Sequence, residues 1–87
     1  MSSPWVDNIA AMAMLIHILR VAEDERTARY DYGEPGNLDR TLVIDKVTGE
    51  VSALHGAADA YFSRAAVKVS RAWSGQGQLP PHLTWAS

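Results

Sequence analysis

The dominant pattern along the chain is a run of eleven residues without a formal charge, from Ile9 to Leu19. Placed at helical steps, its large side chains cover an arc of roughly 240°, against about 100° for an ordinary surface helix. Pro4, which follows two serines, is typical of the first turn of a helix, and the charged cluster 23–26 closes the run. The sequence therefore predicts a first helix that is apolar on nearly all sides and must pack against two different surfaces.

After this run the hydrophobic period changes from helical to alternating. Apolar and charged residues alternate over 28–32, which predicts a strand. A segment rich in Gly and Pro, 33–37, predicts a loop. Residues 40–45 are rich in β-branched side chains and predict a second strand.

A tight hairpin turn is predicted over 45–50, because an Asp opens this segment and Gly49 is placed to take a positive φ. The return strand covers 51–54. The expected facing pairs are Ile44 with Val51 and Leu42 with Ala53.

Helical spacing of apolar residues over 57–74 predicts a second helix, which Gly75 would end. The last residues contain Pro80-Pro81, which favours an extended conformation. The predicted fold class is α+β: a helix, a three-stranded antiparallel sheet and a helix, with both helices on one sheet face. We expect one domain over residues 1–74 and an extended C-terminal tail over 75–87.

Composition narrows the function classes. A chain of 87 residues allows one domain, and the absence of Cys excludes disulfides and thiolate metal sites. The three His are scattered, so no metal or other cofactor is predicted. A net charge of −2 is not the overall balance of a nucleic-acid binder. No basic segment precedes the apolar run, which is too short to span a membrane, so a cytoplasmic location is expected.

The part of the first helix that one sheet cannot cover predicts a partner surface. We expect a homodimer, or a protein partner, because a small domain cannot bury such an arc by itself. A Trp close to the chain end often docks on apolar surface, so the tail is expected to contribute an anchor. The predicted partner-binding residues are Trp5, Met12, Met14, Ile18, Val21 and Trp85.

Two alternatives remain open. Arg64, Lys68 and Arg71 share one face of the second helix and could contact phosphate. The predicted order of elements is also that of double-stranded RNA-binding domains, although the dense lysines expected near the start of their second helix are absent. A ligand pocket or small enzyme is the other alternative, with candidate lining residues Tyr30, Tyr32 and Tyr61.

No motif supports catalysis, so the sequence favours a non-enzymatic accessory protein that binds proteins or itself. Several acidic residues lie in or near the predicted loops, but their spacing resembles no known calcium loop. His55 comes just before Gly56 at a strand-to-helix junction, where a role in the turn explains it better than a catalytic triad.

Overall fold

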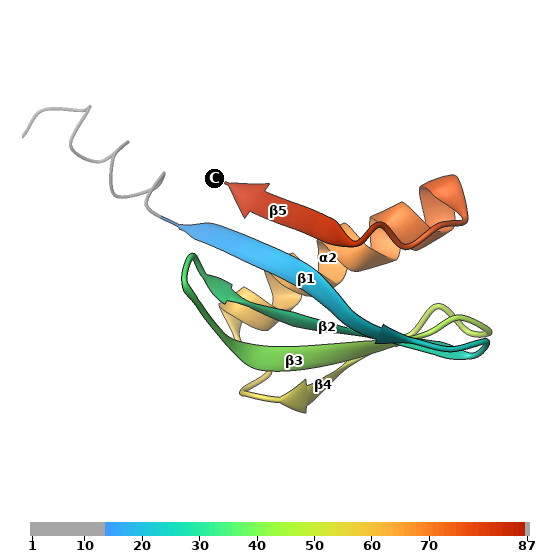
Figure 1. Cartoon of the computed structure of the whole chain (residues 1–87), viewed down its shortest axis with the longest axis horizontal. Coiled ribbons are helices and arrows are strands. Elements are labelled where there is room, and N and C mark those ends of the chain that lie inside the picture. Colours follow the sequence, from blue (N-terminus) through green and yellow to red (C-terminus); the bar gives the residue numbers. More distant parts are fainter. Residues whose placement is uncertain (1–13, 87) are drawn as a thin grey trace, which may run out of the picture.

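Four consecutive strands form an antiparallel meander, and a helix then leads to a fifth strand in the same sheet (Figure 1). The computed structural model describes residues 14–86. The elements in chain order are β1 (Leu15–Glu23), β2 (Thr27–Glu34), β3 (Asn37–Asp45), β4 (Val51–His55), α2 (Ala60–Gln76) and β5 (His82–Ala86).

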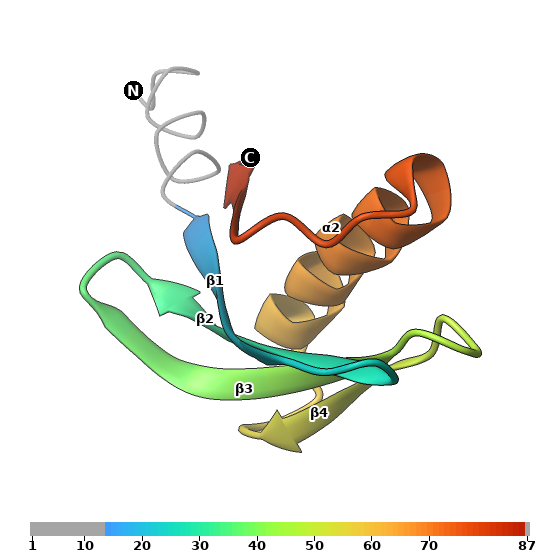
Figure 2. The ribbon, with the colours of Figure 1, turned by 45° about the vertical axis from the view of Figure 1, so that its right-hand side comes forward.

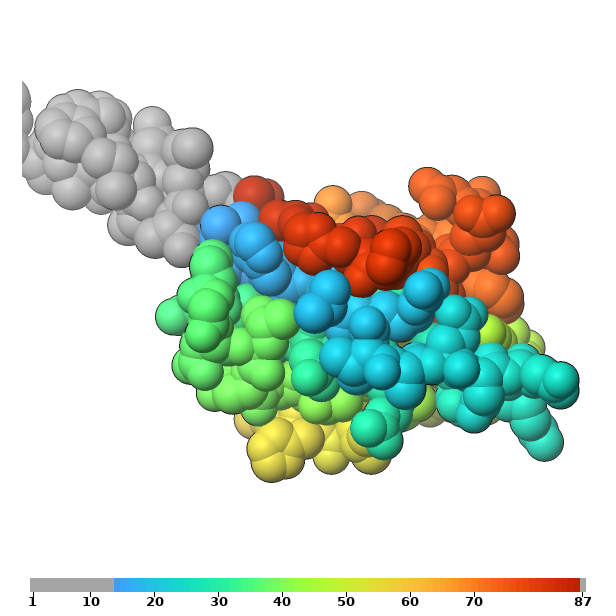
Figure 3. Space-filling model, viewed as in Figure 1, coloured from blue at the N-terminus to red at the C-terminus, as the bar shows by residue number. Residues whose placement is uncertain are grey.

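The strand order across the sheet is β4-β3-β2-β1-β5, so β4 and β5 are the two edges. Figure 2 shows that α2 lies across one face of the sheet. The space-filling view in Figure 3 looks onto the opposite face, where side chains of all five strands are visible. The fold therefore has two layers, with the hydrophobic core between the sheet and α2. No helix or strand of residues 14–86 covers the second sheet face, which we call the bare face.

The predicted fold class shares the α+β class and the antiparallel sheet with the structure, but its architecture is wrong. The sheet has five strands rather than three, and the described residues contain one helix rather than two. The order of elements is consequently not that of a double-stranded RNA-binding domain. Within residues 14–86, no helix combines the length and apolarity needed to cross a membrane.

The first predicted helix is wrong for the residues that the structure describes, because 15–23 form β1. Ile16 and Ile18 are fully buried against α2, whereas Leu19 lies on the bare face. Alternation with a period of two is therefore present, but apolar side chains on both faces hide it. Residues up to Ala13, which include the rest of the predicted helix, lie outside the described part of the chain.

The expected extended tail is also wrong, because residues 82–86 form β5 and pair antiparallel with β1. In this register Leu83 faces Ile18 and Trp85 faces Ile16, so both side chains point to the helix-covered side. The two prolines come just before the strand, where a missing N–H is tolerated, rather than within it.

The predicted β3–β4 hairpin is confirmed in detail. Gly49 has a φ of 78° and donates its N–H to the Asp45 carbonyl, and the Asp45 side chain accepts from the backbone of Val47 and Thr48. The facing pairs are Ile44 with Val51 and Leu42 with Ala53, as expected.

The second predicted helix is confirmed with shifted ends. Asp59 caps its N-terminus by accepting from the Phe62 N–H, and Gly77, in the left-handed conformation, ends it. Ala65, Val69 and Ala72 are the buried face of α2, and these small side chains let the helix lie close to the sheet. The largest fully buried side chains facing them are Tyr30, Tyr32, Ile16, Ile18, Leu42 and Ile44.

Candidate protein-interaction edges

The two edge strands are the least protected backbone of the described residues. β4 (VSALH) and β5 (HLTWA) each pair with one neighbour only, and neither contains a charged residue or a proline. Folded proteins usually protect such edges with charged side chains, prolines or covering segments, because open N–H and C=O groups can pair with another chain. In the part of the chain that the structure describes, β4 is protected only by its short length and by a bulge opposite Thr41/Leu42.

The outward hydrogen-bonding groups of β4 follow from its pairing with β3. Asp45 donates its N–H to the Glu50 carbonyl, so this pair is hydrogen-bonded across the hairpin. Because hydrogen-bonded and non-hydrogen-bonded pairs alternate in an antiparallel ladder, Ser52 points its backbone groups to β3. Val51 and Ala53 therefore present their N–H and C=O groups outward, where a further strand could bind.

An open hollow of about 330 Å³ lies between β4 and the adjacent side of α2. Small or apolar side chains dominate its lining, which comprises Gly49, Val51, Ala66, Val67, Ser70 and Arg71. Leu54 on β4 (55% exposed) and Val67 on α2 (36% exposed) are exposed large apolar side chains, and so is Val47 (72% exposed) in the turn before β4. The β4 edge thus combines open backbone groups with apolar surface that nothing in residues 14–86 covers.

The β5 edge has the same kind of backbone but a different helix side. Arg20 donates its N–H to the Pro81 carbonyl, so by the same alternation His82, Thr84 and Ala86 present their backbone groups outward. The Arg64 guanidinium lies over the Trp85 ring, 5.9 Å from its centroid. The basic side of α2 therefore flanks β5.

Arg64 and the residue four positions later, Lys68, lie on this side of α2, and we call these two residues the basic row. The third predicted cation, Arg71, lines the hollow beside β4 instead. Arg64 and Lys68 are half-buried and Arg71 is exposed. Arg64 donates a hydrogen bond to the Ala60 carbonyl within its own helix. Within residues 14–86, none of the three forms an ion pair with a carboxylate.

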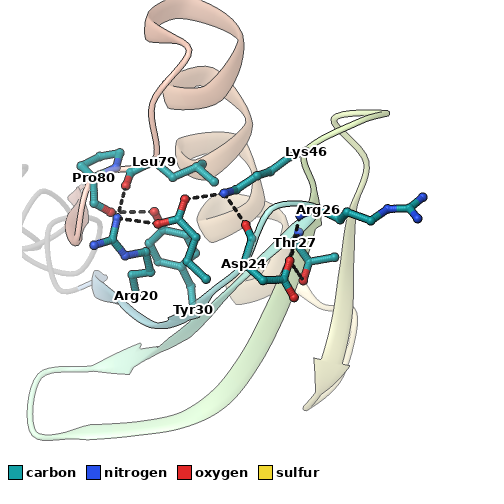
Figure 4. Close-up of polar contacts among 9 residues, drawn as sticks. Arg20, Asp24, Arg26, Thr27, Tyr30, Lys46, Leu79 and Pro80 are labelled. Carbon is teal, nitrogen blue, oxygen red and sulfur yellow. Dashed lines mark hydrogen bonds and ion pairs between the residues drawn. The ribbon is translucent and has the colours of Figure 1, made fainter.

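A polar cluster at one end of the sheet fixes the loop that leads into β5 (Figure 4). Arg20 donates to the Leu79 carbonyl at 2.6 Å and lies 3.2 Å from Glu23. The Tyr30 hydroxyl donates to the Pro80 carbonyl at 2.6 Å, and burial raises the pKa of Tyr30 to about 12. The cluster thus binds two consecutive carbonyls of this loop.

The same cluster also anchors the two hairpin turns. Lys46 donates a hydrogen bond to the Asp24 carbonyl, and its Nζ atom lies 2.5 Å from Glu23 Oε2. The hydrogen bond from Lys46 lowers the pKa of the Glu23 carboxyl. The Asp24 carboxylate accepts from the backbone N–H groups of Arg26 and Thr27, which lowers its pKa. A hollow of about 510 Å³ lies beside these groups. Because the charged groups bind one another and backbone carbonyls, we interpret the cluster as structural.

A second stacked group lies near the start of α2. The Arg40 guanidinium lies 4.5 Å from the centroid of the Tyr61 ring. The Tyr61 hydroxyl donates a hydrogen bond to Glu34, and this bond raises the pKa of Tyr61. Burial raises the pKa of Tyr32, whose hydroxyl is buried without a hydrogen-bond partner in the described part of the chain. These contacts hold the β2–β3 turn against the helix.

Of the predicted partner-binding residues, the four that the structure describes do not form one surface. Trp5 and Met12 lie outside the described residues. Ile18 is fully buried, Met14 and Trp85 pack against the core, and Val21 is exposed at the bulge of β1. Trp85 does serve as an internal anchor of its own chain, although its Nε1 atom is buried with no hydrogen-bond partner among residues 14–86.

The other candidate residues have mainly structural positions. Tyr30 and Tyr32 are fully buried core residues rather than walls of an open pocket. Among the described residues no group of three or more His, Asp and Glu could hold a metal ion. Asp45 opens the hairpin turn, as its sequence position suggested, and Asp31 accepts a hydrogen bond from Thr41 on the bare face.

The residues that the sequence analysis missed are the exposed apolar side chains of the β4 edge. Val47, Leu54 and Val67 are isolated in the sequence, so no local period distinguishes them. They belong to three different elements, namely the β3–β4 turn, β4 and α2, and the strand order places β4 at an edge of the sheet. A partial signal was present, since the predicted return strand carries no charge.

Comparisons with protein-family models, with curated proteins and with solved structures found no match to this chain.

Proposed function

We propose that the protein is a small non-enzymatic protein-binding domain, and that its first partner is a second copy of itself, joined through the β4 edges. The observation that carries this proposal is the open, uncharged β4 strand beside an apolar hollow. Two such strands can pair antiparallel about a two-fold axis, which is the commonest symmetry of soluble oligomers. The two sheets would then continue into one another.

The surroundings of β4 suit self-pairing. No charge lies on the strand, so no register brings like charges opposite each other. Ala66 and Ser70 face the hollow and are small, which leaves room for the neighbouring helix of the partner copy. Leu54 and Val67 would leave water on pairing, and burial of apolar surface is the main driving force of association.

The dimer is expected to be weak. A five-residue edge buries less area than the 1,200–2,000 Å² or so of a standard interface, so a dissociation constant in the micromolar range is expected. Sedimentation velocity over a range of micromolar concentrations should show the mass rise toward twice the chain mass of 9.5 kDa.

Two matched proline variants test which edge joins the copies. Ala53→Pro removes an outward N–H from β4 and leaves the ladder to β3 intact, so it should keep the protein monomeric at every concentration. Thr84→Pro removes the equivalent outward N–H from β5 and should still dimerise. Circular dichroism establishes that both variants are folded. A parent protein that remains monomeric at high concentration, or dimerisation lost only in Thr84→Pro, would contradict the proposal.

A further inference from the structure

We propose that the β5 edge binds an extended acidic segment of a partner protein, which adds to the sheet as a sixth strand beside β5. Its carboxylates would lie along the basic row of α2. This site is separate from the proposed dimer edge and does not depend on dimerisation.

The backbone of β5 can accept such a strand. His82, Thr84 and Ala86 present their N–H and C=O groups outward, and no side chain on β5 carries a formal charge. The cluster around Arg20 and Tyr30 fixes the loop before the strand. The edge is therefore held in place before a partner arrives, which lowers the entropy cost of binding.

The basic row supplies the selectivity. Arg64 is held over Trp85, so its positive charge lies beside the strand that a partner would extend. Arg64 and Lys68 are four residues apart, a rise of about 6 Å along the helix. Alternate residues of an extended strand repeat at about 6.5–7 Å on one face. Acidic residues at alternate positions of the partner segment would therefore match these two cations.

Charge also distinguishes an acidic strand from two other possible ligands of this edge, a second β5 strand and a nucleic acid. Self-pairing of two β5 strands would bring two basic rows together, and like charges at close range destabilise such a contact. Nucleic acid is less favoured, because the two cations of the basic row are few against the many phosphate contacts of typical binders and the net charge of the chain is −2. An acidic strand satisfies both the open backbone and the unpaired cations.

The probe is a fluorescent peptide in which glutamate alternates with valine, titrated with the full chain and followed by anisotropy. The parent protein should bind it, and added salt should weaken the binding because exposed charges are screened. The double variant Arg64→Glu/Lys68→Glu should weaken binding about tenfold or more, since each exposed charge pair contributes a modest free energy. Thr84→Pro should abolish binding by removing a backbone donor.

Three controls make the result specific. Arg26→Glu/Arg29→Glu changes the net charge equally but lies on β2 and the preceding turn, so it should bind as the parent does. A peptide with lysine in place of glutamate should not bind. Equal loss in both double variants, or binding unaffected by Thr84→Pro, would overturn the proposal. Tighter binding to a double-stranded RNA or DNA of the same net charge would overturn it in favour of nucleic acid.

Discussion

The two edges of the sheet have nearly the same strand and very different surroundings. β4 and β5 are both five residues long, uncharged and free of proline. The side of α2 near β4 presents the small side chains of Ala66 and Ser70 over a hollow, with Arg71 also in its lining, whereas the side near β5 presents Arg64 over Trp85. The binding preference of an edge strand is therefore set by the helix side next to it, and not by the strand sequence alone.

The edges also differ in how they are attached to the core. β4 is the last strand of a local meander, joined to β3 by a tight turn. β5 returns from the far end of α2 and pairs with β1, more than sixty residues away in sequence. Its side chains Leu83 and Trp85 pack against the core, and the preceding Leu79 is itself buried. β5 is thus an edge and a part of the core at once.

The largest expected effect comes from removing β5. A chain that ends after Gln78 loses Leu79, Leu83 and Trp85 from the core. Full burial of a large apolar side chain contributes about 1.5–3 kcal/mol, and Leu83 and Trp85 are half-buried, so the loss is about 5 kcal/mol, close to the whole stability of a small domain. Thermal unfolding followed by circular dichroism should lose its cooperative transition. An unchanged melting temperature would show that β5 is a peripheral edge like β4.

A smaller effect is expected from the contact that fixes the loop before β5. Tyr30→Phe removes the hydrogen bond to the Pro80 carbonyl and should lower the free energy of unfolding by about 1–1.5 kcal/mol. Urea denaturation of the two proteins measures the difference. The variant should bind the acidic peptide more weakly, while its dimerisation through β4 should be unchanged. If the variant weakened peptide binding and dimerisation equally, the two edges would be coupled.

The same tyrosine predicts a pH dependence. The pKa of Tyr30 is raised from 10 to about 12 in the folded protein, so the folded state holds this proton more tightly than the unfolded state. The stabilisation is fully present below pH 10 and is lost as the pH rises toward 12. The loss of stability over this range should be smaller in Tyr30→Phe. Identical pH profiles would show that burial does not protect the hydroxyl.

Local signals explain which parts of the fold were predictable. The Asp45 and Gly49 turn, the pairing of Ile44 with Val51, and the helix after Asp59 all depend on neighbours within a few residues. β1 was not predictable in this way, because Ile16, Ile18 and Leu19 cover both of its faces. β5 was not predictable because its partner strand lies far away in sequence.

The candidate site was predictable only in part. The basic row was visible as helical spacing in the sequence, but its position beside an open edge required the strand order. Val47, Leu54 and Val67 carried no pattern at all. Surfaces that are assembled from several elements cannot be recognised before their tertiary arrangement is known.

The smallest expected effect concerns the turn that leads into β4. Gly49 has a φ of 78°, a conformation that a Cβ atom disfavours, so Gly49→Ala should cost about 1 kcal/mol. The added Cβ would lie 4.0 Å from Trp73, which is ordinary contact, so backbone strain rather than a clash causes the loss. Because Gly49 lines the hollow beside β4, the variant should weaken dimerisation more than peptide binding at β5. Gly36→Ala is the matched control, since Gly36 also has a positive φ and open space but lies in the β2–β3 turn. Gly36→Ala should lower the melting temperature by a similar amount and leave the dimer intact. If both variants weakened the dimer equally, general destabilisation and not the β4 edge would control self-association.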